Sequence, residues 1–477
     1  MDTKQLKQKI LDLAIRGKLV PQDPNDEPAS VLLERIRAEK EQLIAQGKLK
    51  KSKSKISDKP HYENVPFEIP ESWEWVRLGQ LYNAVSAKRV LQAEWQREGV
   101  SFYRAREIVK LAQFGSVDND LFISEEHYQR LKETYGIPQP NDIMLSAVGT
   151  IGRSYVVKNS DRFYYKDASV LCLQNIHSLN SLYIQLVLSS QLVQEQMYDK
   201  SKGTTVDTIT IEKVGEYTFP LPPLAEQVRI VETVEQWFEL IDRLEKNKQD
   251  LQEAIKQTKA KVLDLAIHGK LVPQDPNDEP AIELLKRINP NFKPCDTSHY
   301  ENMPTGWSVC KLCDIAKITA GGTPSRKIIS FWDGGTIPWL KIADMTASGK
   351  YIRTASEYIT EDGMKNSSAK LMRKGTLLYT IFASIGEVGI LDFDATCNQA
   401  IANIDLHISE MTDYIYYYLR NLQAYMYSIS KGCTQQNINQ GILKSATIPL
   451  PPLTEQKRIA DQIEIIFASL DTITAEL

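Results

Sequence analysis

Two cysteines, Cys310 and Cys313, have the CxxC spacing that is found in zinc sites and in redox pairs. No second CxxC and no nearby CxH pair completes a tetrahedral zinc site. The pair also lies in a predicted strand, residues 307–315, whereas a redox thiolate is stabilised at a helix N-terminus. The missing ligands and the strand context therefore favour reduced, partly buried thiols over a metal or redox centre.

The common catalytic motifs are missing from the sequence. The Gly-Lys pairs that begin at residues 17, 47, 269 and 349 are not followed by the Ser or Thr of a P-loop. Both Pro-Pro pairs stand in Leu-Pro-Pro-Leu, unlike the Asn/Asp/Ser-Pro-Pro-aromatic tetrapeptide of amino-methyltransferases, and no Pro-Asp dipeptide begins a nuclease site. The six histidines form no HxH or HExxH pair for a metal. We expect a non-catalytic chain that binds no cofactor or metal itself.

The composition is typical of a soluble globular protein with two or three domains, since 42% of the 477 residues are apolar and 25% are charged. No apolar run is long enough to cross a bilayer, and the polar N-terminus lacks the apolar core of a signal peptide, so we expect a cytoplasmic protein without membrane contact. The net charge of −4 argues against a strong free-standing DNA binder, because phosphate neutralisation supplies most non-specific affinity. It is compatible with local base recognition by a chain whose partners contact the phosphates.

The copies of an internal repeat flank regions whose sequences differ. Residues 9–29 and 261–281 differ at only two positions, Ile10/Val262 and Arg16/His268. Residues 219–230 and 448–459 share Pro-Leu-Pro-Pro-Leu-x-Glu-Gln-x-Arg-Ile. These repeated segments, here called the framework, therefore occur twice, and the sequence between them differs from one copy to the other.

The repeat is circularly permuted. The first half of the central segment 226–273 recurs at the C-terminus in residues 455–477, and its second half recurs at the N-terminus in residues 9–21. Placed end to end, the two termini would rebuild a second copy of the central segment. The sequence therefore predicts a pseudo-two-fold molecule whose termini lie near each other.

The central segment is predicted to be one long helix with an apolar stripe. Its apolar residues recur mostly at steps of three and four: Ile230, Val234, Trp237, Ile241, Leu244, Leu251, Ile255, Val262 and Leu265. Gly269 and Pro273 end the helix, which would span roughly 65 Å at the α-helical rise. The stripe must be buried, and we expect an antiparallel pair with the helix rebuilt from the termini, with Trp237 in the core. The alternative is a homodimeric coiled coil of the central helix alone.

Two regions of about 150 residues, 63–219 and 301–448, contain short β-prone runs broken by Gly, Pro and Asn, and predict mixed α/β domains. A helix is expected at 179–198 in the first region and at 412–430 in the second. A short helix follows Pro28 and Pro280, and the first extends to about residue 46. The basic run 48–55 favours a solvated linker over a phosphate contact.

The predicted fold class is α+β, with two mixed α/β domains separated by long antiparallel coiled-coil helices. The expected division of the chain is 1–27 for the N-terminal framework helix, 28–222 for the first domain with its entry helix and linker, 223–273 for the central helix, 274–452 for the second domain and 453–477 for the C-terminal helix.

This arrangement resembles the specificity subunit of Type I restriction-modification systems over essentially the whole chain. The resemblance rests on Leu-Pro-Pro-Leu-x-Glu-Gln-x-Arg-Ile in both repeats, Leu-Asp-Leu-Ala-Ile-x-Gly-Lys-Leu-Val-Pro at 11–21 and 263–273, and the turn Gly321-Gly-Thr-Pro-Ser-Arg326. It implies one target-recognition domain for each half of a bipartite double-stranded DNA site, and helices that set the spacer. It further implies two docked methyltransferase subunits and added restriction-motor subunits, which would bind S-adenosylmethionine, ATP and magnesium.

Base recognition requires side chains that donate and accept hydrogen bonds in forks, such as Arg and Lys to guanine or Asn and Gln to adenine. The DNA-binding candidates are polar residues clustered in loops after predicted strands. In the first domain they are Ser86, Lys88, Arg89, Tyr103, Arg104, Arg106, Arg153, Lys202, Thr204 and Thr205. In the second they are Gly322, Thr323, Ser325, Arg326, Lys327, Lys341, Lys431, Gln435, Gln436 and Asn437. The family's glycine-threonine-proline turn falls on Gly322, Thr323 and Pro324, and the first domain has no counterpart at 85–89.

Two other functions compete with DNA recognition. A non-catalytic protein-protein scaffold with two binding domains is supported by the acidic pI near 6.0. An enzyme that acts alone, such as a fused restriction-modification protein, is disfavoured by the missing motifs.

Overall fold

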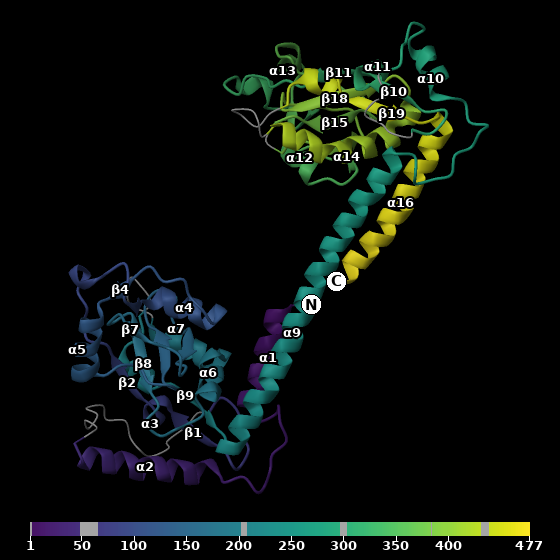
Figure 1. Ribbon diagram of the computed structural model, residues 1–477. Helices are drawn as coiled ribbons and strands as arrows, with labels where there is room; N and C mark the ends of the chain where they lie inside the picture. The colour runs from purple at the N-terminus through teal and green to yellow at the C-terminus, as the bar shows by residue number, and fades with distance from the viewer. Residues whose placement is uncertain (1, 48–64, 202–207, 296–302, 383, 431–437) are drawn as a thin grey trace. The chain divides into compact units, whose positions relative to one another are not determined.

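The computed structural model describes residues 2–47, 65–201, 208–295, 303–382, 384–430 and 438–477. The chain divides into two compact units, Met1–Asn247 (unit 1) and Lys248–Leu477 (unit 2). Each unit contains a domain of mixed helices and strands together with segments of long helix (Figure 1). The predicted α+β class is confirmed.

In its described residues, unit 1 contains three sheets, ordered β1-β9, β2-β8-β5-β6 and β4-β3-β7. Its strands are β1 (Glu74–Arg77), β2 (Asn83–Ser86), β3 (Val100–Tyr103), β4 (Phe122–Ile123), β5 (Ile143–Ser146), β6 (Ser154–Val156), β7 (Phe163–Tyr165), β8 (Val170–Gln174) and β9 (Thr218–Leu221). Its helices are α1 (Thr3–Ile15), α2 (Ala29–Ala45), α3 (Leu78–Leu81), α4 (Ala105–Phe114), α5 (Glu125–Tyr135), α6 (Ser181–Ser189), α7 (Gln191–Ser201), α8 (Ile211–Gly215) and the first part of α9 (Leu224–Ile267).

The part of unit 2 that the structure describes also contains three sheets, ordered β10-β19, β11-β18-β15-β16-β13 and β14-β12-β17. Its strands are β10 (Ser308–Lys311), β11 (Ala316–Ala320), β12 (Ile337–Leu340), β13 (Tyr351–Ile352), β14 (Glu357–Ile359), β15 (Leu377–Thr380), β16 (Val388–Leu391), β17 (Thr396–Cys397), β18 (Ile401–Leu406) and β19 (Thr447–Leu450). Its helices are the rest of α9, α10 (Ala281–Ile288), α11 (Leu312–Ile315), α12 (Ile342–Thr346), α13 (Glu361–Lys365), α14 (Thr412–Ser430), α15 (Gln440–Lys444) and α16 (Leu453–Glu476).

The two sheet domains share most of their topology although their sequences diverge, and the largest sheet of unit 2 has the additional edge strand β13. In each three-stranded sheet the middle strand, β3 or β12, has an antiparallel neighbour (β4 or β14) and a parallel neighbour (β7 or β17). The two-stranded sheets also correspond, since β1 pairs with β9 and β10 pairs with β19 in antiparallel fashion. The prediction of two similar domains on one repeated framework is confirmed.

In unit 1 the helix α1 runs antiparallel to the first part of α9 (Figure 1). Thr3 Oγ1 donates to Glu245 Oε2 at 3.3 Å, and Lys7 Nζ pairs with Asp242 Oδ1 at 2.5 Å. Between the two helices lies an apolar seam, formed by Ile10, Leu11, Ala14, Ile230, Val234 and Ile241, which joins the main core of unit 1. One half of the predicted antiparallel pair is therefore present within this unit.

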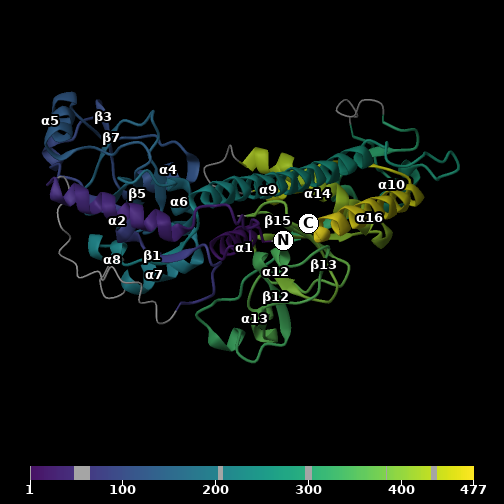
Figure 2. The same ribbon diagram turned by 90° about the horizontal axis from the view of Figure 1, so that it is seen from below.

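Unit 2 repeats this packing with α16 and the last part of α9, which lie side by side in both views (Figures 1 and 2). Lys248 Nζ donates to the backbone oxygen of Leu477, and Lys259 pairs with Asp471. The seam consists of Val262, Leu263, Ala266, Ile459, Ala460 and Ile463. Lys259 and Asp471 occupy the repeat positions of Lys7 and Asp242, so the framework is duplicated in its contacts as well as in its sequence.

A buried polar cluster, here called joint 1, connects the start of α9 to the loop after α1. Glu226 is 1% exposed and accepts hydrogen bonds from Trp73 Nε1 at 2.9 Å and from Gln22 Nε2 at 2.6 Å. Arg229 Nη2 pairs with Asp26 Oδ2 at 2.6 Å. Burial raises the pKa of Glu226, although the bonds from Trp73 and Gln22 oppose this.

Joint 2 is the copy of this cluster at the start of α16. Trp307 Nε1 donates to Glu455 Oε2 at 3.0 Å, and Arg458 Nη2 pairs with Asp278 Oδ2 at 2.5 Å. Both loops begin with a glycine, Gly17 or Gly269. These residues adopt positive φ angles of 65° and 64°, which glycine adopts more readily than other residues. The shared loop sequence of the repeat therefore fixes the same joint in both units.

The expected burial of Trp237 is wrong. This side chain is 47% exposed, and Leu244 and Leu251 on the same helix are 45% and 41% exposed. The partner helix covers the face that carries Ile230, Val234 and Ile241, which are buried. The apolar stripe of α9 is therefore wider than the surface that one packed helix covers.

Two further predictions need correction. Cys310 is buried in β10, as expected, but Cys313 is exposed in the short helix α11 instead of continuing a strand. The helix predicted at 179–198 is interrupted at Ser190, whose backbone is extended and whose hydroxyl donates to the Val187 carbonyl at 2.6 Å, so it forms α6 and α7. The predicted helix at 412–430 is confirmed as α14.

Among the described residues, none of the helices has the length and apolar character needed to span a membrane. Within the same described ranges, no cluster of three or more His, Cys, Asp or Glu side chains is arranged to hold a metal ion.

Candidate nucleic-acid interface

A basic residue stands at the same place in both sheet domains, between the middle strand of the three-stranded sheet and the helix that follows it. In unit 1 this residue is Arg104, between β3 and α4, and in unit 2 it is Lys341, between β12 and α12. The backbone N–H of each residue donates a hydrogen bond to the acid three residues later. Arg104 donates to Glu107 Oε2 at 2.9 Å, and Lys341 donates to Asp344 Oδ2 at 2.8 Å. The spacing of a capping box therefore fixes where each basic side chain leaves the backbone.

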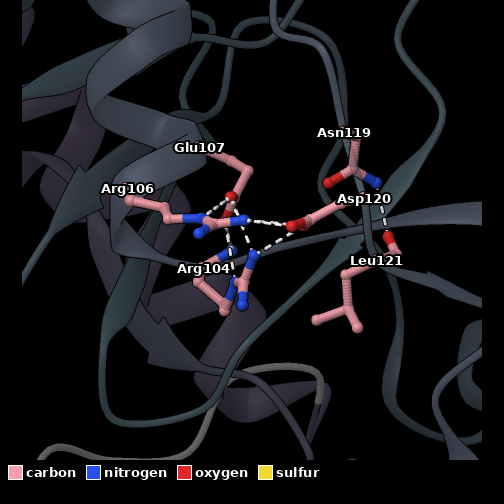
Figure 3. A network of polar contacts seen from close by, with 6 residues as sticks. All are labelled: Arg104, Arg106, Glu107, Asn119, Asp120 and Leu121. Atoms are coloured by element: carbon pink, nitrogen blue, oxygen red, sulfur yellow. Dashed lines mark hydrogen bonds and ion pairs between the residues drawn. The ribbon is translucent and has the colours of Figure 1, made fainter. Parts of the chain in front are cut away.

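In unit 1 two arginines and two carboxylates form one network (Figure 3). Arg104 donates from Nε and Nη2 to Glu107, both at 3.1 Å, and from Nη2 to Asp120 Oδ1 at 2.8 Å. Arg106 donates from Nη2 to both oxygens of Asp120 at 2.7 Å, and from Nε to Glu107. Glu107 is 1% exposed whereas Asp120 is 68% exposed, so the network runs from the core to the surface. We call it cluster 1.

Both carboxylates of cluster 1 are stabilised in their ionised form. Burial alone would raise the pKa of Glu107, but the hydrogen bonds from Arg104 and Arg106 outweigh it and lower the pKa below its usual value. The hydrogen bond from Arg106 lowers the pKa of Asp120. The cluster consequently holds two positive and two negative charges at neutral pH.

Cluster 2, the corresponding group in unit 2, is centred on Glu357 at the start of β14. Lys341 Nζ donates to Glu357 Oε1 at 2.6 Å, and Arg326 Nη1 lies 2.5 Å from Oε2. The Arg326 guanidinium also stacks 3.6 Å from the ring centroid of Trp332 and lies 4.9 Å from that of Trp339. Burial would raise the pKa of Glu357, but the bonds from Lys341 and Arg326 lower it.

The Gly-Gly-Thr-Pro turn positions Arg326. Trp339 Nε1 donates to the Gly322 carbonyl at 2.9 Å, and Thr323 Oγ1 donates to Gln399. A Cβ on Gly321 would lie 2.2 Å from the Asn398 carbonyl oxygen, and one on Gly322 would lie 2.3 Å from the Ala369 nitrogen, so neither position tolerates a side chain. This close packing explains why the turn needs two glycines.

The other described candidates lie on loops and strand ends. Tyr103 is half-buried with its ring 4.8 Å from Phe163, and the Lys88 ammonium lies 5.4 Å from the Tyr135 ring centroid. Exposed positions are held by Ser86, Arg89, Arg153, Ser325 and Lys327. Seven candidates lie outside the described residues: Lys202, Thr204, Thr205, Lys431, Gln435, Gln436 and Asn437.

The structure thus brings Arg104 together with Arg106, and Arg326 together with Lys341. Sequence reasoning missed the acids of these clusters, Glu107, Asp120 and Glu357. The capping-box spacing from Arg104 to Glu107 was a usable signal. Asp120 lies just before β4 and Glu357 opens β14, so only the pairing of these strands with β3 and β12 reveals the two acids.

Comparison with known proteins gives one family for both units. A family model described as "Type I restriction modification DNA specificity domain" matches residues 70–253 and 304–477. The specificity subunit of the Type I restriction enzyme EcoEI from Escherichia coli is 28% identical, over 99% of this chain and 90% of that protein. The EcoAI specificity subunit from the same organism is 30% identical, over 67% of this chain and 63% of that protein.

Solved structures show the same fold. The HsdS subunit from Thermoanaerobacter tengcongensis aligns with a TM-score of 0.52 and 18% identity, over 86% of this chain and 93% of the other. A chain from a study of complex assembly and conformational transition of the type I R-M system aligns with a TM-score of 0.58 and 20% identity, over 86% and 95%. At these identities the likeness concerns the fold alone.

Proposed function

The chain belongs to the Type I restriction modification DNA specificity domain family, and on this premise we propose that it is the non-catalytic DNA-recognition subunit of a Type I restriction-modification complex. Each sheet domain recognises one half of a bipartite site in double-stranded DNA. The half-sites differ in sequence, because the basic side chains at corresponding positions differ between the two domains.

The observation that carries this proposal is a basic residue that stands at the same place in both domains and lies close to a second basic side chain in each. Arg104 holds this place in unit 1 and Lys341 holds it in unit 2. The second basic side chain is Arg106 of α4 in unit 1, and in unit 2 it is Arg326 of the turn after β11. Arginine and lysine are the side chains that most often contact guanine O6 and N7 in the major groove. The framework and its ion pairs are duplicated, whereas the basic pairs of the two domains differ. This combination suits the recognition of an asymmetric site.

The long helices belong to the proposal as spacer and as docking surface. They set the distance between half-sites and bind two methyltransferase subunits, and restriction-motor subunits join that complex. The chain's net charge of −4 supports this dependence on partners, since a lone DNA-binding protein usually carries a basic surface. S-adenosylmethionine, ATP and magnesium would then be held by the partners.

The recognition domains are assigned to residues 28–222 and 274–452, and all of the candidate side chains named from the sequence belong to the proposed interface. Lys202, Thr204 and Thr205 occupy the same position along the domain as Lys431, Gln435, Gln436 and Asn437, since both groups precede a short helix and the last strand. Corresponding segments in two recognition domains are suited to contact corresponding parts of the two half-sites.

The decisive experiment is to co-express the chain with its methyltransferase subunit and to map modified adenines across the host genome. We expect a single bipartite motif. Exchange of residues 63–219 for the matching region of a relative should then change one half of that motif and preserve the other half. Modification without a motif, or a change in both halves, would overturn the proposal.

A protein-protein scaffold is the alternative function that the acidic pI of about 6.0 favours. A gel-shift assay with the co-expressed methyltransferase subunit distinguishes the two functions. Retention of DNA supports recognition, and a complete failure to retain any DNA in the presence of that partner supports the scaffold.

A further inference from the structure

In each domain, a carboxylate from the segment that pairs antiparallel with the middle strand contacts both members of the basic pair. Asp120 lies just before β4, the antiparallel neighbour of β3, and contacts both Arg104 and Arg106. Glu357 opens β14, the antiparallel neighbour of β12, and contacts both Lys341 and Arg326. The sequences around the two acids differ, so the arrangement recurs where the framework repeat does not extend.

In cluster 1, charge balance separates two possible uses. Cluster 1 contains Arg104, Arg106, Glu107 and Asp120, whose formal charges sum to zero. Phosphate binding gains from net positive charge, and a neutral group offers little of it. Hydrogen bonds to base edges depend instead on well-placed donors, which a neutral but rigid cluster can supply.

The pattern of hydrogen-bonded atoms favours contacts to base edges over phosphate binding. The described hydrogen bonds of both Arg104 and Arg106 use Nε and Nη2, so the carboxylates define the plane of each guanidinium. An exposed arginine otherwise samples many rotamers, and ordering it on binding costs affinity. In cluster 2 the rings of Trp332 and Trp339 add a second constraint on Arg326.

We propose that Asp120 and Glu357 are positioning residues for specificity, each orienting the basic pair of its own domain toward the base edges of one half-site. This inference rests on the proposed function. The acids act through the basic side chains and they reduce indiscriminate attraction to phosphates.

The test uses Asp120→Asn and Glu357→Gln in the full chain, co-expressed with the methyltransferase subunit. Each substitution keeps the side-chain size and removes one negative charge, so non-specific DNA affinity should rise. The slope of log affinity against log salt should steepen by up to about one unit for each phosphate gained. Discrimination against wrong bases should fall about 10- to 100-fold in one half-site, measured on a library of randomised sites, and the other half-site should be unaffected.

Matched controls come from exposed acids of the same domains. Glu125 pairs with Arg162 in unit 1, and Glu361 pairs with Lys365 at 3.0 Å in unit 2. Glu125→Gln and Glu361→Gln remove the same charge away from the clusters and should leave base preference unchanged. Asp120→Glu retains the charge, and it should restore the salt dependence and part of the base preference.

Each outcome bears on one hypothesis. Unchanged base preference in both variants, or equal loss in both half-sites, would overturn the positioning role. A uniform fall in affinity without relaxed preference would also overturn it, because a purely structural defect has that signature. If the unmodified chain shows no base preference with its partner, the proposed function itself fails, and this result is visible before any variant is made.

Discussion

At the scale of single residues, the Trp73–Glu226 and Trp307–Glu455 hydrogen bonds link each sheet domain to a framework helix. Both glutamates are 1% exposed, and burial raises the pKa of each one. A buried carboxylate that loses a donor keeps its desolvation cost, so the indole N–H contributes more than an exposed hydrogen bond would.

We expect Trp73→Phe to destabilise unit 1 by about 1–3 kcal/mol, because the substitution leaves the Glu226 carboxylate short of one donor. Urea unfolding monitored by circular dichroism measures this change. Trp95→Phe is the matched control, since Trp95 Nε1 is buried without a hydrogen-bond partner in the described part of the chain. Equal effects of the two substitutions would contradict the assigned role of the Trp73 bond.

At the scale of elements, α9 combines a buried seam with exposed apolar positions. Ile241 is 1% exposed whereas Trp237, one turn earlier, is 47% exposed. Ile241 therefore reports on the packing of α9 against the rest of the chain, and Trp237 reports on the apolar surface that this packing leaves exposed.

Ile241→Ala should lower the free energy of unfolding by about 2–5 kcal/mol, because it opens a cavity in the seam with α1. Trp237→Ala should change the stability of the isolated chain by less than about 1 kcal/mol, since its ring is half in solvent. Thermal or urea unfolding of the two variants makes the comparison. A larger loss for Trp237→Ala would place that ring in the core after all.

The sequence predicted the framework well because its signals are local. The three- and four-residue steps from Ile230 to Val262 and the glycine at 269 predicted α9, and the near-identical repeats predicted a duplicated packing. The burial of Trp237 was not predictable, because the width of the covered face depends on how many helices pack there. The break at Ser190 depends likewise on tertiary context.

The recognition clusters could be predicted only in part. The sequence identified Arg104, Arg106, Arg326 and Lys341 as candidates, since they follow β-prone runs. Asp120 and Glu357 contact them through strand pairing, and no short-range pattern encodes that pairing. The fold therefore adds the acids that determine how the basic side chains are held.

At the scale of the whole molecule, α9 is one continuous helix of 44 residues that belongs to both units. If it acts as the spacer, inserting about four helix-forming residues between Lys246 and Lys256 should lengthen it by roughly 6 Å and rotate its ends by about 40°. The tolerated gap between half-sites should change while both half-sequences persist, as read from methylation maps.

The control for this experiment is an insertion of equal length in the exposed loop between Asp23 and Glu27, which should leave the gap unchanged as long as Asp26 still reaches Arg229. Altered half-sequences after the helix insertion would mean that α9 contacts bases itself. An unchanged gap would mean that another part of the complex determines it.

The two joints have one more consequence. Joint 1 and joint 2 are made of the same residue types in the same contacts, so a domain bounded by them meets identical attachment points in either position. Such a domain is interchangeable: transplanted from one position to the other, it would keep its base preference and only reverse its place in the site. New specificities could then arise by shuffling whole domains, with no adjustment of the helices that carry them.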